Sequence, residues 1–285
     1  MCAKCSDDGH GHDAGAGQAI AGLEMAGEVI GMGADVKGFQ LGDRVMAMAP
    51  KSYAQQCLTD YRLALRAPVM LSWEEAAATP AAMMTAHDAL LTNGALSNGD
   101  CVLIEAATTS VGQAASQIAR AFGAAQIIGT SGSPEKITRL TDLGITHPVN
   151  SRSEDVVAAV KSASRNHGAD VIIAQIGGET ANDLISAAAV KARIVNVGRL
   201  GQWSGTIDLN EHSAKRINMI GVSFRSRDLA EHSAVAAAAS MDILPLIETG
   251  DFIVHVDRVF PLAEADAAQA YMKSGSHFGK IVLSV

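Results

Sequence analysis

The chain has few of the residues that build disulfide frameworks, membrane spans or nucleic-acid surfaces. Its four cysteines, Cys2, Cys5, Cys57 and Cys101, do not form a disulfide framework. No apolar run reaches the ~18 residues that a membrane span needs. Lys and Arg total 22 against 30 Asp and Glu, and the net charge of −8 argues against a nucleic-acid or anionic-membrane partner. The polar start lacks the features of a secretory signal, so we expect a cytoplasmic protein.

The first 18 residues contain metal-ligand residue types without the spacing of a metal site. Cys2 and Cys5 are followed by His10 and His12, among residues that are mainly Asp, Gly and Ala. Structural zinc sites usually separate their two ligand pairs by more chain than this. We therefore expect residues 1–18 to be a flexible segment, and we expect no metal site.

Length and hydrophobic content are those of a folded enzyme. The 285 residues are 48% hydrophobic and 18% charged, which excludes a mainly disordered chain. This length is enough for one large domain or two moderate ones with a sizeable core.

The most informative stretch reads as a strand, a tight turn of small residues and a helix. An apolar run begins at Cys101, and residues 113–123 place apolar side chains on one helix face. Such a helix N-terminus binds a pyrophosphate through its unpaired N–H groups and its dipole. The glycine fingerprint is degraded, because only Gly112 remains while Thr109 and Ser110 stand where glycines are usual. Alone, the pattern also fits a crossover that binds nothing.

Strands and helices continue to alternate up to residue 224. We predict strands over residues 126–129, 170–176, 193–198 and 217–224, and helices over residues 134–144, 154–166 and 179–190. This alternation predicts an α/β fold with a doubly wound parallel sheet, which binds ligands beyond the carboxyl ends of its strands. We assign residues 90–251 to this dinucleotide-binding Rossmann domain.

The end of the second strand favours NADPH over NADH. An NAD site usually has a carboxylate there, whereas this chain has small residues and hydroxyls, with Lys136 one helical turn later. Such a set suits the 2′-phosphate of NADPH. The alternative is that Lys136 is an ordinary solvated helix lysine.

The residues on either side of this domain have a β-rich pattern. Residues 22–31 and 36–45 read as short strands broken by glycines, and residues 52–58 continue the pattern. The tail from residue 252 reads as strand, helix and strand. We therefore expect residues 19–89 and 252–285 to form a second domain together.

The chain resembles the zinc-independent quinone oxidoreductases of the medium-chain dehydrogenase/reductase superfamily, and within them the p53-inducible-protein-like subgroup. The matching motifs follow the family order over residues 20–285. They are Gly22-Leu-Glu-Met-Ala-Gly27, Gly42-Asp-Arg-Val45, Thr85-Ala-His-Asp-Ala-Leu90, Thr109-Ser-Val-Gly112, Gly132-Ser133 with Lys136, Ile176-Gly-Gly178, Phe224-Arg-Ser-Arg227 and Phe278-Gly-Lys-Ile-Val-Leu283. The resemblance implies a Rossmann domain and a GroES-like β domain.

The resemblance also implies which residues bind the cofactor. The pyrophosphate would be held by Thr109, Ser110, Val111 and Gly112. The adenosine 2′-phosphate would be held by Gly132, Ser133 and Lys136, with Ser151 near them. The nicotinamide end would be lined by Gly198, Arg199, Leu200, Phe224, Arg225 and Ser226.

Three departures from the family pattern affect these expectations. Zinc-dependent relatives carry a His-Glu pair where this chain has Leu23-Glu24, and leucine cannot ligate a metal. A tyrosine that commonly helps to bind the 2′-phosphate is replaced by Ser151, a loss for which Arg152 could compensate. The first strands of the β domain have no counterpart, so we expect that domain to be incomplete at its N-terminus.

The expected function is zinc-independent transfer of a hydride from NADPH to a quinone or a related conjugated carbonyl compound. The alternatives are reduction of an enone or enoyl thioester, and a non-catalytic NADPH-binding protein that has lost its pocket strands. No nucleophilic triad stands at a convincing spacing, and Tyr53 reads as a packing residue rather than a catalytic acid. The resemblance and the exposed last strand of the series predict a homodimer.

Overall fold

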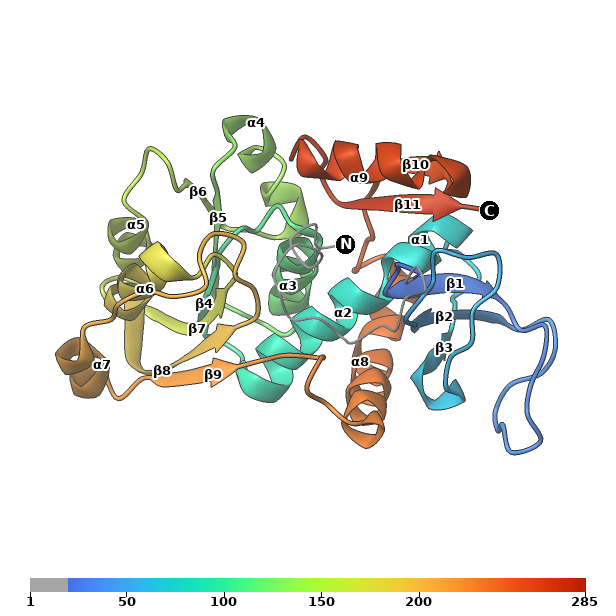
Figure 1. Ribbon diagram of the computed structural model, residues 1–285. Helices are drawn as coiled ribbons and strands as arrows, with labels where there is room; N and C mark the ends of the chain where they lie inside the picture. Colours follow the sequence, from blue (N-terminus) through green and yellow to red (C-terminus); the bar gives the residue numbers. More distant parts are fainter. Residues whose placement is uncertain (1–19) are drawn as a thin grey trace. The chain divides into compact units, whose positions relative to one another are not determined.

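The computed structural model describes residues 20–285, which divide into two compact units (Figure 1). The described part of the first unit comprises residues 20–82, 232–248 and 253–285. The second comprises residues 83–231 and 249–252. The expected flexible segment and its cysteine and histidine residues lie outside the described residues.

The second unit is built on a six-stranded sheet in which all neighbouring strands are parallel. Its strands are β4 (Cys101–Ile104), β5 (Gln126–Ser131), β6 (His147–Asn150), β7 (Ala169–Ala174), β8 (Ala188–Asn196) and β9 (Asn218–Gly221). They lie in the order β6-β5-β4-β7-β8-β9. The chain therefore runs outward from β4 toward β6 and then from β7 toward β9, so the order reverses between β4 and β7.

Helices cover both faces of this sheet. They are α3 (Ser110–Ala121), α4 (Pro134–Ile137), α5 (Val156–Ala163), α6 (Ala181–Ala187) and α7 (Leu209–Lys215), with a π-helix η3 (Asp88–Asn93) and short 3₁₀ turns η4 (Thr141–Leu143) and η5 (Gly178–Thr180). Helices α5 and α6 contact each other (Figure 1). They share a buried cluster with alternate strand residues such as Leu103 and Ile172. Because strand side chains alternate between faces, Val102 and Ile173 point to the face that α3 and η3 cover.

This architecture confirms the predicted α/β fold. Strand β4 is buried at every position, as expected for a central strand covered on both faces. None of the helices formed by residues 20–285 is both long and apolar enough to cross a membrane.

The first unit contains two small sheets and the helices that pack on them. The antiparallel sheet has the order β1 (Glu24–Glu28), β2 (Arg44–Met48) and β3 (Ala64–Arg66), and β10 (Val256–Pro261) pairs in parallel with β11 (Lys280–Ser284). The other elements are α1 (Trp73–Ala78), α8 (Leu229–Thr249), α9 (Ala265–Lys273), η2 (Tyr61–Leu63) and η6 (Leu262–Glu264). Helix α1 contacts both sheets, and the ammonium of Lys280 pairs with the carboxylate of Glu24. Helix α2 (Pro80–His87) carries the chain from the first unit into the second.

Some predicted elements have other bounds in the structure. The expected helix over 134–144 is replaced by α4 and η4, and the expected helix over 179–190 ends at Ala187, where β8 begins. Residues 36–40 and 52–58 form no strand, and among the described residues β2 pairs with β1 and β3 only. The tail has the predicted order of strand, helix and strand.

Candidate functional site

The predicted cofactor-binding residues all follow the carboxyl ends of strands in the second unit. Because neighbouring strands are parallel, these ends lie along one edge of the sheet. The predicted pyrophosphate residues follow β4, the predicted 2′-phosphate residues follow β5 and β6, and the predicted nicotinamide residues follow β8 and β9. The strand order therefore places the pyrophosphate turn between the other two groups, as an extended dinucleotide requires.

The turn between β4 and α3 is built for a close approach of the backbone. Thr109 is the N-cap of α3, and its hydroxyl accepts a hydrogen bond from the N–H of Gly112 at 3.0 Å. A Cβ on Gly112 would lie 2.6 Å from the carbonyl oxygen of Ala106 and from the Cα of Ala107. Ala106 itself adopts a positive φ of 46°, which is unusual for a residue with a side chain. Only glycine therefore fits at position 112, and the first turn of α3 packs directly against the backbone that follows β4.

The loop after β5 carries the residues expected at the 2′-phosphate. Ser133 is the N-cap of the short helix α4, and its hydroxyl accepts a hydrogen bond from the N–H of Lys136 at 3.4 Å. The strand ends in Thr130 and Ser131, so no carboxylate competes with a phosphate at that position. Lys136 is half-buried. Ser133 and Lys136 therefore lie within one helical turn of each other after β5, and their contact with a 2′-phosphate stays a prediction.

Arg152 lies beside the same loop. A Cβ on Gly132 would lie 3.0 Å from the Nε atom of Arg152, so the absence of a side chain at Gly132 leaves room for the guanidinium. The N–H of Ser151 donates to the carbonyl of Ser131 at 3.1 Å, which ties the end of β6 to the end of β5. The structure thus brings Gly132, Ser151 and Arg152 together.

The loops after β8 and β9 contain the residues expected at the nicotinamide. The N–H groups of Gly198 and Leu200 donate to the carbonyls of Ala174 and Gln175, at 3.2 and 2.9 Å, so this loop lies against the end of β7. Four of the residues expected at the nicotinamide are exposed to solvent: Arg199, Leu200, Arg225 and Ser226.

An ion pair between the half-buried Arg227 and the buried Asp88 anchors the loop that follows β9. The guanidinium of Arg227 donates to the carboxylate of Asp88 at 2.6 Å and lies 5.0 Å from the centre of the Phe224 ring. The Asp88 side chain is 1% exposed and the Arg227 side chain 16%. Asp88 begins the π-helix η3, a distortion that often occurs at functional sites.

Two polar residues that sequence reasoning missed lie at the centre of this edge. Glu105 follows β4 and Gln175 follows β7, and both are buried. The backbone N–H of Gln175 donates to the Glu105 carboxylate at 2.9 Å, and the Gln175 side chain accepts from the Thr109 hydroxyl at 3.2 Å. Burial raises the pKa of Glu105 above its ordinary value, and hydrogen bonds from Thr180, Ile176 and Gln175 offset only part of this rise. A charged or amide side chain directly after an apolar strand was the signal that could have identified them.

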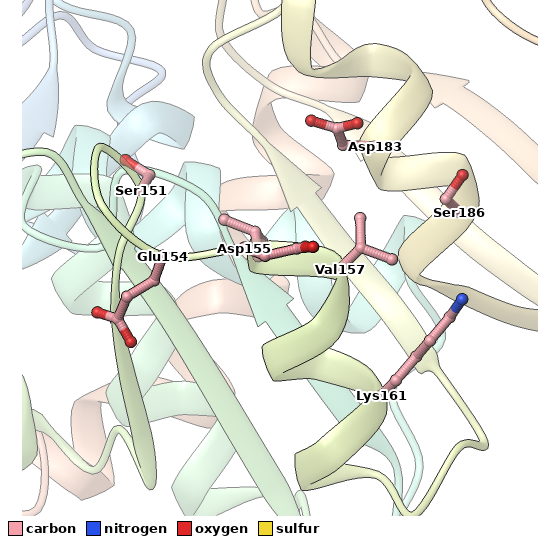
Figure 2. Close-up of a pocket in the computed structure, with 8 residues that line it drawn as sticks. Ser151, Glu154, Asp155, Val157, Lys161, Asp183 and Ser186 are labelled. Carbon is pink, nitrogen blue, oxygen red and sulfur yellow. The ribbon is translucent and has the colours of Figure 1, made fainter.

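A separate cavity of about 550 Å³ lies between α5 and α6 (Figure 2). It is lined by Ser151, Glu154, Asp155, Val156, Val157, Lys161, Asp183 and Ser186. Its lining has three carboxylates, those of Glu154, Asp155 and Asp183, and one lysine, so the cavity does not suit a phosphate. Ser151 is its only lining residue among the predicted cofactor residues. Within residues 20–285 there is no group of three His, Cys, Asp or Glu side chains that could hold a metal ion.

Two protein-family models match the chain. Residues 1–92 match the alcohol dehydrogenase GroES-like domain, and residues 110–240 match the zinc-binding dehydrogenase family. A highly reducing polyketide synthase of Glarea lozoyensis is 32% identical over 93% of this chain. The chain spans about a tenth of the length of that relative.

Two solved enzyme structures are similar to this chain in fold and in sequence. The crystal structure of CurK enoyl reductase has a TM-score of 0.77 and 28% identity, and the match covers 92% of this chain and 78% of that one. A quinone oxidoreductase of Pseudomonas syringae pv. Tomato DC3000 has a TM-score of 0.84 and 25% identity, with 94% and 82% of the two chains covered.

Proposed function

Because the chain belongs to the medium-chain dehydrogenase/reductase superfamily of oxidoreductases, we propose that it is an NADPH-dependent reductase of conjugated carbonyl compounds. The fold is an NAD(P)-binding fold. The observation that carries the choice of NADPH is the loop after β5, where Ser133 caps α4, Lys136 follows within the helix, and Arg152 lies beside Gly132. These groups offer hydroxyls and positive charge to a 2′-phosphate and no competing carboxylate at the strand end.

The pyrophosphate would lie on the N-terminus of α3. Thr109 caps that helix, and the missing Cβ of Gly112 lets its first turn pack against the backbone after β4. The helix is 12 residues long, so its unpaired N–H groups and dipole act together on a negative charge.

NADPH, when bound, supplies the hydride. The residues of this chain would bind and orient the cofactor, and the loops after β8 and β9 would fix its nicotinamide end. The conjugated acceptor takes the hydride at an electrophilic carbon, and water can protonate the resulting oxyanion or enolate, so no protein acid is required.

Two substrate classes fit this chemistry. An enoyl thioester or enone is supported by the similarity to CurK enoyl reductase and to a highly reducing polyketide synthase. A quinone is supported by the similarity to the quinone oxidoreductase and by the motifs shared with that group, including the p53-inducible-protein-like subgroup.

Steady-state NADPH oxidation tests the proposal. The protein is assayed with a small quinone, a simple enone and a crotonyl thioester, and NADPH binding is titrated separately. Turnover with any of the three supports a reductase, and the largest kcat/KM identifies the substrate class. Tight NADPH binding without turnover of any acceptor would favour a non-catalytic NADPH-binding protein, and the absence of NADPH binding would refute the proposal altogether.

A further inference from the structure

Glu105 and Gln175 directly follow the two strands between which the strand order reverses. Each is 4% exposed, and they follow β4 and β7. Parallel α/β sheets bind their ligands in a crevice at this reversal point, outside the strand ends. The pair is therefore placed where such a crevice has its base, although neither residue belongs to a phosphate-binding or nicotinamide-binding motif.

The Glu105 carboxylate fixes the path of the chain that leaves β7. One of its oxygens accepts hydrogen bonds from the N–H of Gln175 at 2.9 Å and from the N–H of Ile176 at 3.1 Å. These donors precede the bend at Gly177 and Gly178, which both have positive φ. Without the carboxylate, two N–H groups would lack this acceptor close to the core, and an unpaired buried N–H is costly.

Gln175 joins two loops that the proposed function assigns to the cofactor. Its side-chain amide donates to the carbonyl of Glu105 at 2.6 Å and accepts from the hydroxyl of Thr109 at 3.2 Å. Its backbone carbonyl accepts from the N–H of Leu200 at 2.9 Å. One residue thus contacts both the cap of the pyrophosphate helix and the loop expected at the nicotinamide.

We infer that Glu105 and Gln175 are positioning residues that hold the pyrophosphate turn and the nicotinamide loop in one fixed arrangement. The inference rests on the proposed function and adds to it a connection between its two halves. A preformed site binds a flexible dinucleotide more tightly, because less ordering accompanies binding. A displaced nicotinamide also slows hydride transfer, since the reaction depends on close alignment.

The competing interpretation is that the pair only stabilises the fold. In that case its removal lowers the melting temperature but leaves the NADPH affinity of the folded protein unchanged. The two interpretations therefore differ in the dissociation constant for NADPH.

The test compares Glu105→Met and Gln175→Met with the wild type and with Gln117→Met. Gln117 is a matched control, because it is a buried glutamine of the same unit whose amide donates to the carbonyl of Gln113 within α3. We expect both test variants to bind NADPH about tenfold more weakly and to have a lower kcat at saturating NADPH, whereas the control keeps its affinity. Glu105→Gln should keep its affinity to within about twofold, because one amide oxygen can still accept both N–H groups.

The outcomes separate this inference from the proposed function. If the wild type does not bind NADPH, the proposed function fails. If the wild type binds NADPH and the folded test variants bind it as tightly as Gln117→Met does, the positioning role is refuted while the function stands. If the methionine variants do not fold, Gln175→Asn carries the same comparison, because it keeps an amide but shortens its reach to Thr109.

Discussion

Replacing Lys136 with glutamate should change the cofactor preference of the enzyme. The substitution puts a carboxylate where the proposed site offers an ammonium to the 2′-phosphate, in the short helix α4 that Ser133 caps. NADH lacks that phosphate, so the loss should fall on NADPH alone.

The size of the effect follows from the kind of contact. A charge-assisted hydrogen bond between an ammonium and a phosphate contributes about 1.5–3 kcal/mol, which corresponds to about 10- to 150-fold in affinity. Lys136 is half-buried, so the contact is less screened by salt than one on the open surface. Arg152 is exposed, and we expect Arg152→Ala to weaken NADPH by only about 1 kcal/mol.

Titration of each variant with NADPH and with NADH measures both effects. Lys161→Glu is the matched control, because it makes the same charge change on α5. It should leave the ratio of the two dissociation constants unchanged. Equal losses for NADPH and NADH in Lys136→Glu, or no loss for either, would show that Lys136 does not contact the 2′-phosphate.

The local pattern of the sequence was enough to predict the sheet and the turn between β4 and α3. An apolar strand, small residues and an amphipathic helix within about 20 residues leave few alternatives, and β4 and α3 have the predicted order. The positions of the predicted site residues relative to one another follow from the parallel sheet, because every strand end reaches the same edge.

The helix boundaries that were predicted wrongly depend on contacts with residues distant in the sequence. In the segment 134–144, Leu140 and Leu143 are buried at a spacing of three, which fits 3₁₀ turns as well as an α-helix. The alanine-rich run 187–189 favours a helix, but Ala188 pairs with Ala169 and extends β8 instead.

Contacts between residues far apart in the chain were beyond the reach of local patterns. Asp88 and Arg227 are 139 residues apart, and Glu105 and Gln175 are 70 apart. No spacing rule relates such partners, and each side chain alone reads as an ordinary surface charge or amide. Only the folded structure shows that they meet.

Four further predictions concern packing, an ion pair, assembly and pH. Gly112→Ala should weaken NADPH binding more than about tenfold and destabilise the fold by about 1–3 kcal/mol, because the new Cβ meets backbone atoms 2.6 Å away; an unchanged NADPH titration would contradict this. Asp88→Ala should cost about 3 kcal/mol in denaturant unfolding by leaving the half-buried Arg227 without its carboxylate partner, and a loss below about 1 kcal/mol would contradict it. The free edge of β9, where Met219 is 47% exposed, should pair with its copy, so light scattering should give the mass of a dimer, and a monomer at micromolar concentration would refute it.

Glu105→Gln should stabilise the protein at neutral pH, because burial raises the pKa of Glu105 above its ordinary value, so that ionisation of this group costs the folded state more than the unfolded one. Since the folded state binds the proton more tightly, this group's contribution to stability is highest below its unfolded pKa and falls as the pH rises toward its folded pKa. The advantage of Glu105→Gln in melting temperature should therefore shrink as the pH is lowered through that range, and an advantage that stays constant or grows toward acid pH would show that the hydrogen bonds to the carboxylate outweigh its burial.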